Sequence, residues 1–189
     1  MFSSKSRKEP LCTMEELRNI CLFPTGGIQE FPTENSDEVY PGIYIGNEAS
    51  AADVNQLKNK SIGYVLNAAY GRDKTLNMVE PLAPKDYALA GIQFLGIPAV
   101  DCMSYPLDRH FNQAITFIRE CLHSGNNVLV HCKQGISRSA ALVLAYLVAE
   151  VGMSLQEATR AVRNRREIMP NDGFLVQLCN LNEVINRKH

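Results

Sequence analysis

The sequence lacks any apolar run long enough to cross a membrane. Its longest apolar stretch, residues 140–149, is far shorter than the roughly 20 residues that a transmembrane helix needs. Residues 1–5 also lack the apolar core of a signal peptide, and Phe2 stands where N-myristoylation requires glycine. We therefore expect no membrane partner and a location in the cytoplasm, with the nucleus as a second location.

An excess of charge of one sign is absent as well. The chain has 19 Lys and Arg residues against 20 Asp and Glu residues, a formal net charge of −1 at pH 7. Such a balance gives no general attraction to nucleic acid or to an anionic membrane. We expect no nucleic-acid partner, and any recognition of phosphate must come from a local arrangement of residues.

The cysteines lack the paired spacing of zinc sites and the density of a disulfide scaffold, which indicates a reducing, intracellular environment. An unpaired cysteine usually packs as a small hydrophobic residue, so a chemical role needs a special sequence context. Only Cys132 has one. The six cysteines are Cys12, Cys21, Cys102, Cys121, Cys132 and Cys179.

The length of 189 residues and the hydrophobic content of 46% suit one domain with a well-buried core. Residues 1 to about 10 form a polar stretch typical of a solvated tail, and helical spacing from Thr13 to Cys21 predicts a short helix. We divide the chain into residues 1–36, a tail with a short helix, and residues 37–189, the main domain.

Strand and helix patterns alternate through the middle of the chain, and helices follow at the end. This order predicts an α/β fold with a central, mostly parallel twisted sheet flanked by helices. Strands are expected near residues 43–45, 64–66, 92–100 and 128–130, the last apolar on both faces like a doubly covered central strand. Helices are expected over 47–57, 107–122, 139–150, 154–162 and 170–185, with a loop over 71–84.

One stretch carries a chemical pattern, and we call its residues 131–139 the signature loop. It reads His131-Cys132-Lys133-Gln134-Gly135-Ile136-Ser137-Arg138-Ser139, between a buried strand and a buried helix. A loop that turns from a strand into a helix directs backbone N–H groups to one point, where the helix dipole adds positive potential. The pattern predicts a phosphate site formed by Lys133, Gln134, Gly135, Ile136, Ser137 and Arg138.

The same field favours the thiolate form of Cys132, which we predict to be the nucleophile. Such a sulfur is also prone to reversible oxidation. Gly135 gives the loop the backbone freedom for a tight curl, and the planar fork of Arg138 matches two phosphate oxygens.

Two neighbours of this pattern allow alternative roles. Ser139 can cap the helix, or it can donate a hydrogen bond to the sulfur as a leaving group, which we favour beside this loop. For His131 we favour a buried supporting role, holding the loop backbone. Phosphoryl transfer also needs a proton donor from another loop, and Asp101, at the end of the strand expected over 92–100, is the best candidate. By position alone it could equally be a surface-turn aspartate.

With these motifs the sequence resembles the small, atypical dual-specificity protein phosphatases of the VHR type, from about residue 37 to residue 186. The resemblance rests on residues 39–47, 65–69, 95–97, the signature loop, 166–168 and 170–174. It implies that residues 37–189 are a catalytic domain that hydrolyses phosphotyrosine and phosphoserine or phosphothreonine through a phosphocysteine, without metal or cofactor. It also implies Asp101 as general acid, phosphorylated proteins including MAP kinases as partners, and a monomer or weak homodimer.

The resemblance further implies a substrate-binding role for Arg166, for which the alternative is a solvated charge at a helix end. Gln134 and Ile136 stand where phosphatases of the VHR type carry an acidic and an aromatic residue, so the resemblance says least about substrate preference. Two other functions stay open. One is a binding module without catalysis, although such relatives lose the cysteine or the arginine. The other is a phosphatase for phosphoinositides or RNA 5′ ends, whose pockets usually hold more than one basic residue in the loop, where this sequence has only Lys133.

Overall fold

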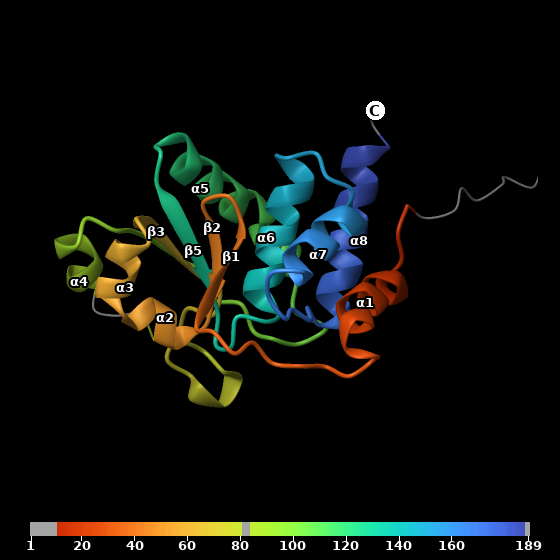
Figure 1. The fold of residues 1–189 in the computed structure, drawn as a ribbon, viewed down its shortest axis with the longest axis horizontal. Coiled ribbons are helices and arrows are strands. Elements are labelled where there is room, and N and C mark those ends of the chain that lie inside the picture. Colours follow the sequence, from red (N-terminus) through yellow and green to blue (C-terminus); the bar gives the residue numbers. More distant parts are fainter. Residues whose placement is uncertain (1–10, 81–83, 188–189) are drawn as a thin grey trace, which may run out of the picture.

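The computed structural model describes residues 11–80 and 84–187 and has a five-stranded sheet at its centre (Figure 1). The strands are β1 (Ser36–Tyr40), β2 (Ile43–Gly46), β3 (Ile62–Asn67), β4 (Gln93–Gly96) and β5 (Asn127–His131), in the order β1-β2-β5-β3-β4. β1 is antiparallel to β2, and the other neighbouring pairs are parallel. The predicted mostly parallel sheet is confirmed, whereas the predicted tail, residues 1 to about 10, lies outside the described residues.

Helices cover both faces of this sheet (Figure 1). On one face lie α2 (Glu48–Ala52), α3 (Val54–Asn59) and α4 (Pro84–Leu89), and on the other lie α5 (Phe111–His123) and α6 (Arg138–Ala149). Beyond them, α7 (Leu155–Arg163) and α8 (Asp172–Asn186) pack against α6, and α1 (Met14–Leu22) packs against α7 and α8. The short helix of the first 36 residues is therefore part of the same folded body.

β5 shows why its sequence is apolar on both faces. Val128, Leu129 and Val130 are all fully buried. Val128 and Val130 belong to the large core beneath α5 and α6, whereas Leu129 belongs to the smaller core beneath α2, α3 and α4. Because successive side chains of a strand point to opposite faces, one short strand serves both cores.

The parallel strands end at the same edge of the sheet, and this edge positions the site. In the register, Gly46 and Asn67, the last residues of β2 and β3, both lie beside His131, the last residue of β5, and Asn67 also lies beside Gly96. Ligands of open α/β sheets bind beyond these carboxyl ends. The signature loop follows β5 there, and the segment after β4 leads to Asp101.

The elements differ from the predicted ones in five places. The helix expected over residues 107–122 begins as a short 3₁₀ helix, Leu107–His110, and is α-helical only from Phe111. The helix expected over residues 47–57 is interrupted at Asp53, whose side chain accepts a hydrogen bond from the Gln56 N–H and caps α3. The strand expected through residue 100 ends at Gly96, before Pro98, which has no N–H for a ladder. β1 and α4 were not predicted.

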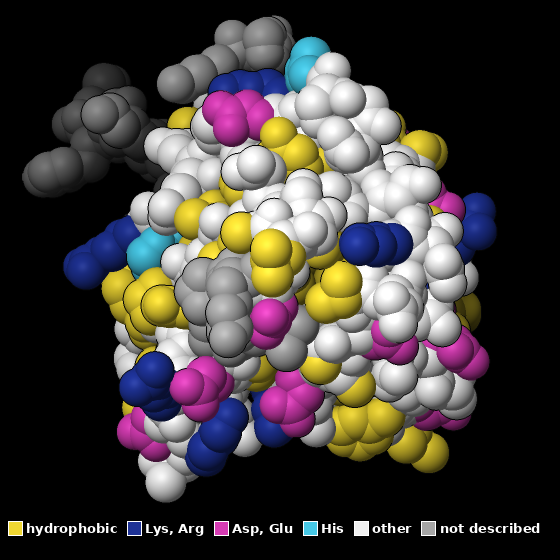
Figure 2. Space-filling model, turned by 90° about the vertical axis from the view of Figure 1, so that its left-hand side faces the viewer, with side chains coloured by type: hydrophobic (Ala, Val, Ile, Leu, Met, Phe, Trp, Pro, Cys, Tyr) yellow, Lys and Arg dark blue, Asp and Glu magenta, His cyan; other side chains and the backbone are white. Residues whose placement is uncertain are grey.

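No helix within residues 11–80 and 84–187 has both the length and the apolar character of a membrane span. Figure 2 shows one face of the molecule, on which Lys and Arg side chains are interspersed with Asp and Glu side chains. This face has no broad area of a single charge, in keeping with the balanced composition.

Candidate active site

Cys132 lies immediately after β5, at the floor of a pocket of about 710 Å³. The residue is only 2% exposed but lines the pocket, so its sulfur is reached from the pocket and not from the outer surface. The signature loop and α6 surround it as the sequence predicts.

The surroundings of the sulfur favour a negative charge. The Gly135 N–H donates to Cys132 Sγ at 3.3 Å, and Ser139 Oγ lies 3.3 Å from the same sulfur. Burial by itself raises the pKa of Cys132, but the Arg138 guanidinium and the hydrogen bonds from Ser139 and the loop backbone outweigh it, so the pKa is below its usual value. Ser139 makes this contact from inside α6, and it does not cap the helix.

This lowered pKa predicts the pH dependence of alkylation. Because the thiolate is the reactive form, the rate of inactivation by iodoacetate should rise with pH around a midpoint below that of an ordinary cysteine. Ser139→Ala removes one stabilising donor and should move the midpoint to higher pH. A wild-type midpoint at the value of a free thiol would contradict the assignment.

Gly135 is required by both conformation and space. Its φ is +69°, in the left-handed region that favours glycine. A Cβ at this position would lie 2.4 Å from the Gly46 carbonyl oxygen and 2.7 Å from Arg166 Nη2. Glycine therefore lets the loop lie directly on the end of β2.

Arg138 is 2% exposed and is held by backbone carbonyls. Its Nη1 donates to Ala99 O and its Nη2 to Asn77 O, both at 3.1 Å. Its Nε lies 3.5 Å from Asp101 Oδ2 and is the only buried side-chain nitrogen or oxygen of the described residues without a hydrogen-bond partner. A buried donor of this kind in a pocket wall suits an oxyanion ligand.

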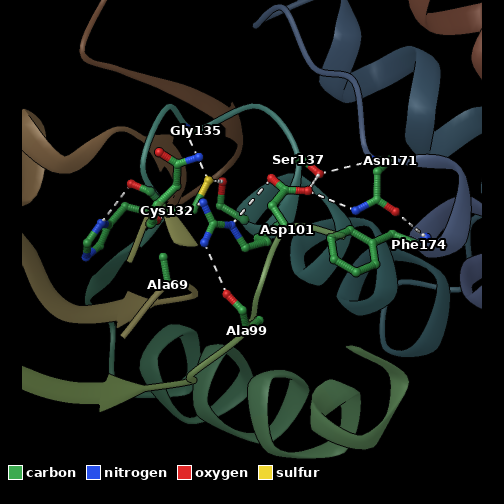
Figure 3. Close-up of polar contacts among 12 residues, drawn as sticks. Ala69, Ala99, Asp101, Cys132, Gly135, Ser137, Asn171 and Phe174 are labelled. Carbon is green, nitrogen blue, oxygen red and sulfur yellow. Dashed lines mark hydrogen bonds and ion pairs between the residues drawn. The ribbon is translucent and has the colours of Figure 1, made fainter. Parts of the chain in front are cut away.

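Asp101 extends into the same pocket, between Ser137 and Asn171 (Figure 3). Ser137 Oγ and Asn171 Nδ2 each donate to Asp101 Oδ1 at 2.8 Å. The segment after β4 thus brings a carboxyl group to the pocket that contains the sulfur and the guanidinium, as the choice of Asp101 requires.

His131 and Lys133, which flank Cys132 in the sequence, each have a polar partner within the protein. Nδ1 of His131 lies 3.4 Å from the Cys132 carbonyl oxygen, and burial lowers the pKa of His131 to about 4, which keeps the ring neutral at pH 7. This is consistent with the supporting role predicted for it. Lys133 lines the pocket but forms an ion pair with Glu48.

Arg166 is buried, so it is not the solvated charge of the alternative interpretation, and it is not among the residues that line the pocket. The substrate-binding role that the resemblance implies for it stays a prediction. The Arg166 side chain is 0% exposed and forms an ion pair of 2.6 Å with Asp37. Its remaining donors bind backbone carbonyls, Nε to Gly135 at 2.9 Å and Nη2 to Gln134 at 3.2 Å. Arg166 therefore supports the signature loop through its bonds to the backbone carbonyls of Gly135 and Gln134.

We predict that Arg166→Ala lowers the free energy of unfolding by about 3 kcal/mol, at the lower end for a broken buried ion pair because Asp37 is 24% exposed. Urea denaturation measures this loss. The matched control is the exposed neighbour Arg165→Ala, which should stay within about 0.5 kcal/mol of wild type. Equal stability of the two variants would refute the supporting role.

Sequence reasoning missed much of the pocket wall. Arg18 and Leu22 of α1, Gln29 and Asn77 line it, and so do residues 169–172 before and at the start of α8. Asn77, with a φ of +52°, belongs to the residues that tolerate this conformation, which is the one local signal that was available. Among the described residues, no group of three or more His, Cys, Asp or Glu side chains could hold a metal ion.

Comparison with known proteins decides the family. Residues 43–184 match the family model described as dual specificity phosphatase, catalytic domain. The chain belongs to this family. It is a small atypical dual-specificity protein phosphatase, and the family hydrolyses phosphorylated proteins through a phosphocysteine.

Individual relatives agree with this assignment. The phosphatase is 40% identical to human dual specificity protein phosphatase 26 over 192 aligned positions, which cover 95% of this chain and 88% of that protein. The crystal structure of human DUSP28 is 27% identical, with a TM-score of 0.71 over 83% of this chain and 99% of that one. A mouse putative dual specificity phosphatase complexed with zinc tungstate is 28% identical, with a TM-score of 0.71 over 87% and 96%.

Proposed function

We propose that Cys132, Asp101, Arg138 and Ser139 perform the phosphatase reaction in two displacements. The proposal rests on one observation: a single pocket holds the Cys132 sulfur, whose pKa is lowered, the buried Arg138 guanidinium and the carboxyl group of Asp101 from a separate loop. The loop amides and Arg138 bind the equatorial phosphate oxygens as charge spreads over them.

In the first displacement, Cys132 Sγ attacks phosphorus and the bond from phosphorus to the substrate oxygen breaks. Asp101 gives its proton to that oxygen, so the alcohol or phenol leaves neutral. In the second, water attacks phosphorus while Asp101 takes its proton, and the bond from phosphorus to sulfur breaks. Ser139, 3.3 Å from the sulfur, donates a hydrogen bond to the departing thiolate.

The test is phosphate release by the purified phosphatase from p-nitrophenyl phosphate and from phosphotyrosine and phosphothreonine peptides, with acid quenching to trap the phosphocysteine. When the substrate carries a labelled phosphate, recovery of the label on the peptide that contains Cys132 supports the assignment. Turnover with the label on another residue would reject it, and binding without any turnover would favour the non-catalytic alternative.

We favour phosphorylated proteins over phosphoinositides or RNA 5′ ends. Lys133 is engaged by Glu48, which leaves the pocket floor with Arg138 as its main cation. Substrates with several phosphates should need more positive charge than this. Initial rates with phosphotyrosine peptides and with phosphoinositide vesicles, measured side by side, decide between them, and faster release from the vesicles would reverse the choice.

MAP kinases are the partners we propose, because the chain resembles the dual-specificity phosphatases of the VHR type. Incubation of a doubly phosphorylated MAP kinase with the phosphatase should remove both phosphates, as read by mass spectrometry of the activation-loop peptide. We also propose a monomer or weak homodimer in the cytoplasm, with the nucleus as a second location. Sedimentation and imaging of the tagged protein test these two points.

A further inference from the structure

Asn171 joins the start of α8 to the proposed general acid (Figure 3). Its side-chain Nδ2 donates to Asp101 Oδ1 at 2.8 Å. Its backbone N–H donates to Ser137 Oγ at 3.2 Å, and that hydroxyl donates to the same Asp101 oxygen at 2.8 Å. Asp101 Oδ1 therefore accepts hydrogen bonds from Asn171 and from Ser137, and the backbone N–H of Asn171 in turn holds the Ser137 hydroxyl.

The orientation of the Asn171 amide is fixed by the helix that it caps. Its Oδ1 accepts the Phe174 N–H at 3.1 Å, as an N-cap side chain does. Since the oxygen is committed to the helix, the amide nitrogen must face Asp101. Both described donors reach Oδ1, so the proton of the acid form belongs on Oδ2, the oxygen 3.5 Å from Arg138 Nε.

The rest of the segment that carries Asp101 is also held by α8. A Cβ on Gly173 would lie 1.9 Å from the Met103 carbonyl oxygen, so the two backbones are in direct contact. Gln177 Nε2 donates to Tyr105 O at 2.9 Å. Residues 101–105 therefore pack against the first turns of α8.

We propose that Asn171 is a positioning residue for Asp101: its amide, fixed by the α8 cap, holds Oδ1 and turns Oδ2, with the proton, toward the phosphate. This inference rests on the proposed function, because it assumes Asp101 as the acid. It adds a requirement that Asn171 be a donor, which capping alone does not impose.

The charged groups around Asp101 set the background for a test based on pH. Arg138 of α6 is the nearest, and Cys132 and Lys133 of the signature loop line the same pocket. From the outer side, Asp172 of α8 lines the pocket but is paired with Arg18 of α1. A new carboxylate at position 171 would lie closer to Asp101 than any of these acidic groups, since Asn171 is already in hydrogen-bond contact with it.

Two substitutions separate positioning from capping. Serine and aspartate are as good at an N-cap as asparagine, so Asn171→Ser and Asn171→Asp should keep α8 and the fold. Asn171→Ser removes the donor to Asp101. Asn171→Asp replaces it with a like charge, which disfavours the ionised form of Asp101. Urea denaturation verifies that both remain as stable as wild type.

We expect Asn171→Ser to lower kcat for a phosphotyrosine peptide roughly three- to ten-fold, because one hydrogen bond to Asp101 is lost. The effect on kcat for p-nitrophenyl phosphate should be smaller. Asn171→Asp should move the alkaline limb of the kcat profile upward by about one pH unit. A purely structural role changes neither the dependence on leaving group nor the position of that limb.

The inference is overturned if both variants keep the wild-type kcat and pH profile, or if both substrates lose rate equally. Carbon-detected NMR titration of the Asp101 carboxyl group provides a readout that needs no turnover. An upward shift of its midpoint in Asn171→Asp supports the contact even in an inactive protein, and an unchanged midpoint rejects it. Failure of the proposed function is thereby distinguishable, since wild type itself would then lack turnover.

Two cysteines away from the pocket lie with their sulfurs close together. Cys12 Sγ, just before α1, lies 3.1 Å from Cys179 Sγ in α8. The chain beside Cys12 is anchored there, because Leu11 N–H donates to Glu183 and Leu11 O accepts from Gln156 Nε2 at 2.7 Å. The sulfurs must approach by only about 1 Å to reach bonding distance.

We infer that Cys12 and Cys179 are a site of disulfide formation by peroxide. The Cys12 thiolate attacks hydrogen peroxide to give a sulfenic acid, and the hydroxide released takes up a proton to become water. Cys179 sulfur then displaces the hydroxyl group and loses its proton, so one S–S bond forms and a second water leaves. The hydrogen bond between the two sulfurs lowers the pKa of Cys12, which favours Cys12 as the sulfur that attacks first.

Peptide mapping of the peroxide-treated Cys132→Ser protein without reductant tests this inference, since the active-site thiol is then absent. We expect a linked peptide containing Cys12 and Cys179 and a melting temperature raised by roughly 5 °C or more. Cys12→Ser or Cys179→Ser in the same background should abolish both changes. A peroxide-treated protein with both thiols still free, or with Cys12 linked elsewhere, rejects the site.

Discussion

Cys132→Ser is expected to abolish turnover while phosphate esters still bind. The serine hydroxyl is not ionised at neutral pH, so the field that favours the thiolate has no nucleophile to act on. The loop amides and Arg138 are unchanged, so the phosphate site persists. We expect kcat to fall on the order of 10⁶-fold, as when the nucleophile is removed from other covalent hydrolases.

The measurement is kcat with p-nitrophenyl phosphate, together with the Kd for a phosphotyrosine peptide by calorimetry. Cys179→Ser is the matched control, because it makes the same chemical change in α8 outside the pocket lining. It should keep wild-type kcat. Near-normal activity of Cys132→Ser would remove the basis for the proposed mechanism.

Asp101→Ala is expected to lower kcat by about 10²–10⁴-fold for substrates with poor leaving groups, the usual contribution of a general acid. The loss should be much smaller for p-nitrophenyl phosphate, whose leaving group departs without a proton. Binding should persist, since Arg138 keeps its bonds to Ala99 and Asn77. The alkaline limb of the pH profile should also disappear with the acid.

A series of aryl phosphates with leaving groups of increasing basicity measures this effect. In wild type the rate should depend weakly on leaving-group basicity, and in Asp101→Ala it should fall steeply. The control is Asp108→Ala, whose side chain is outside the pocket lining and which should follow the wild-type line. Parallel lines for wild type and Asp101→Ala would exclude Asp101 as the acid.

Local chemistry explains which parts of the fold the sequence predicts well. Helix starts were correct where a cap is encoded next to the helix, as for Thr13 before α1 and Ser154 with Glu157 at α7. β1 was missed because it is a short edge strand with only Val39 buried, so it lacks the apolar pattern of a central strand. α4 was missed because it is a single short helix of six residues, too short for a clear helical period.

The site divides in the same way. The signature loop is contiguous, so spacing alone brings Cys132, Arg138 and Ser139 together. Asp101 needed the topology of the sheet, and Asn171 needed the docking of α8, which no local pattern encodes. The burial of Arg166 could not be predicted, because a sequence gives the charge of a side chain but not its burial, and the ion-pair partner Asp37 is distant in sequence.

The position of α1 has a practical consequence. Leu17 and Cys21 are buried against the C-terminal helices, while Arg18 and Leu22 face the catalytic pocket. A truncated enzyme that begins at residue 37 would lose one wall of the catalytic pocket and would expose apolar surface on α7 and α8. The substrate selectivity of such a fragment would be that of a wider pocket beside an exposed apolar surface, so substrate profiling should use a protein that includes α1.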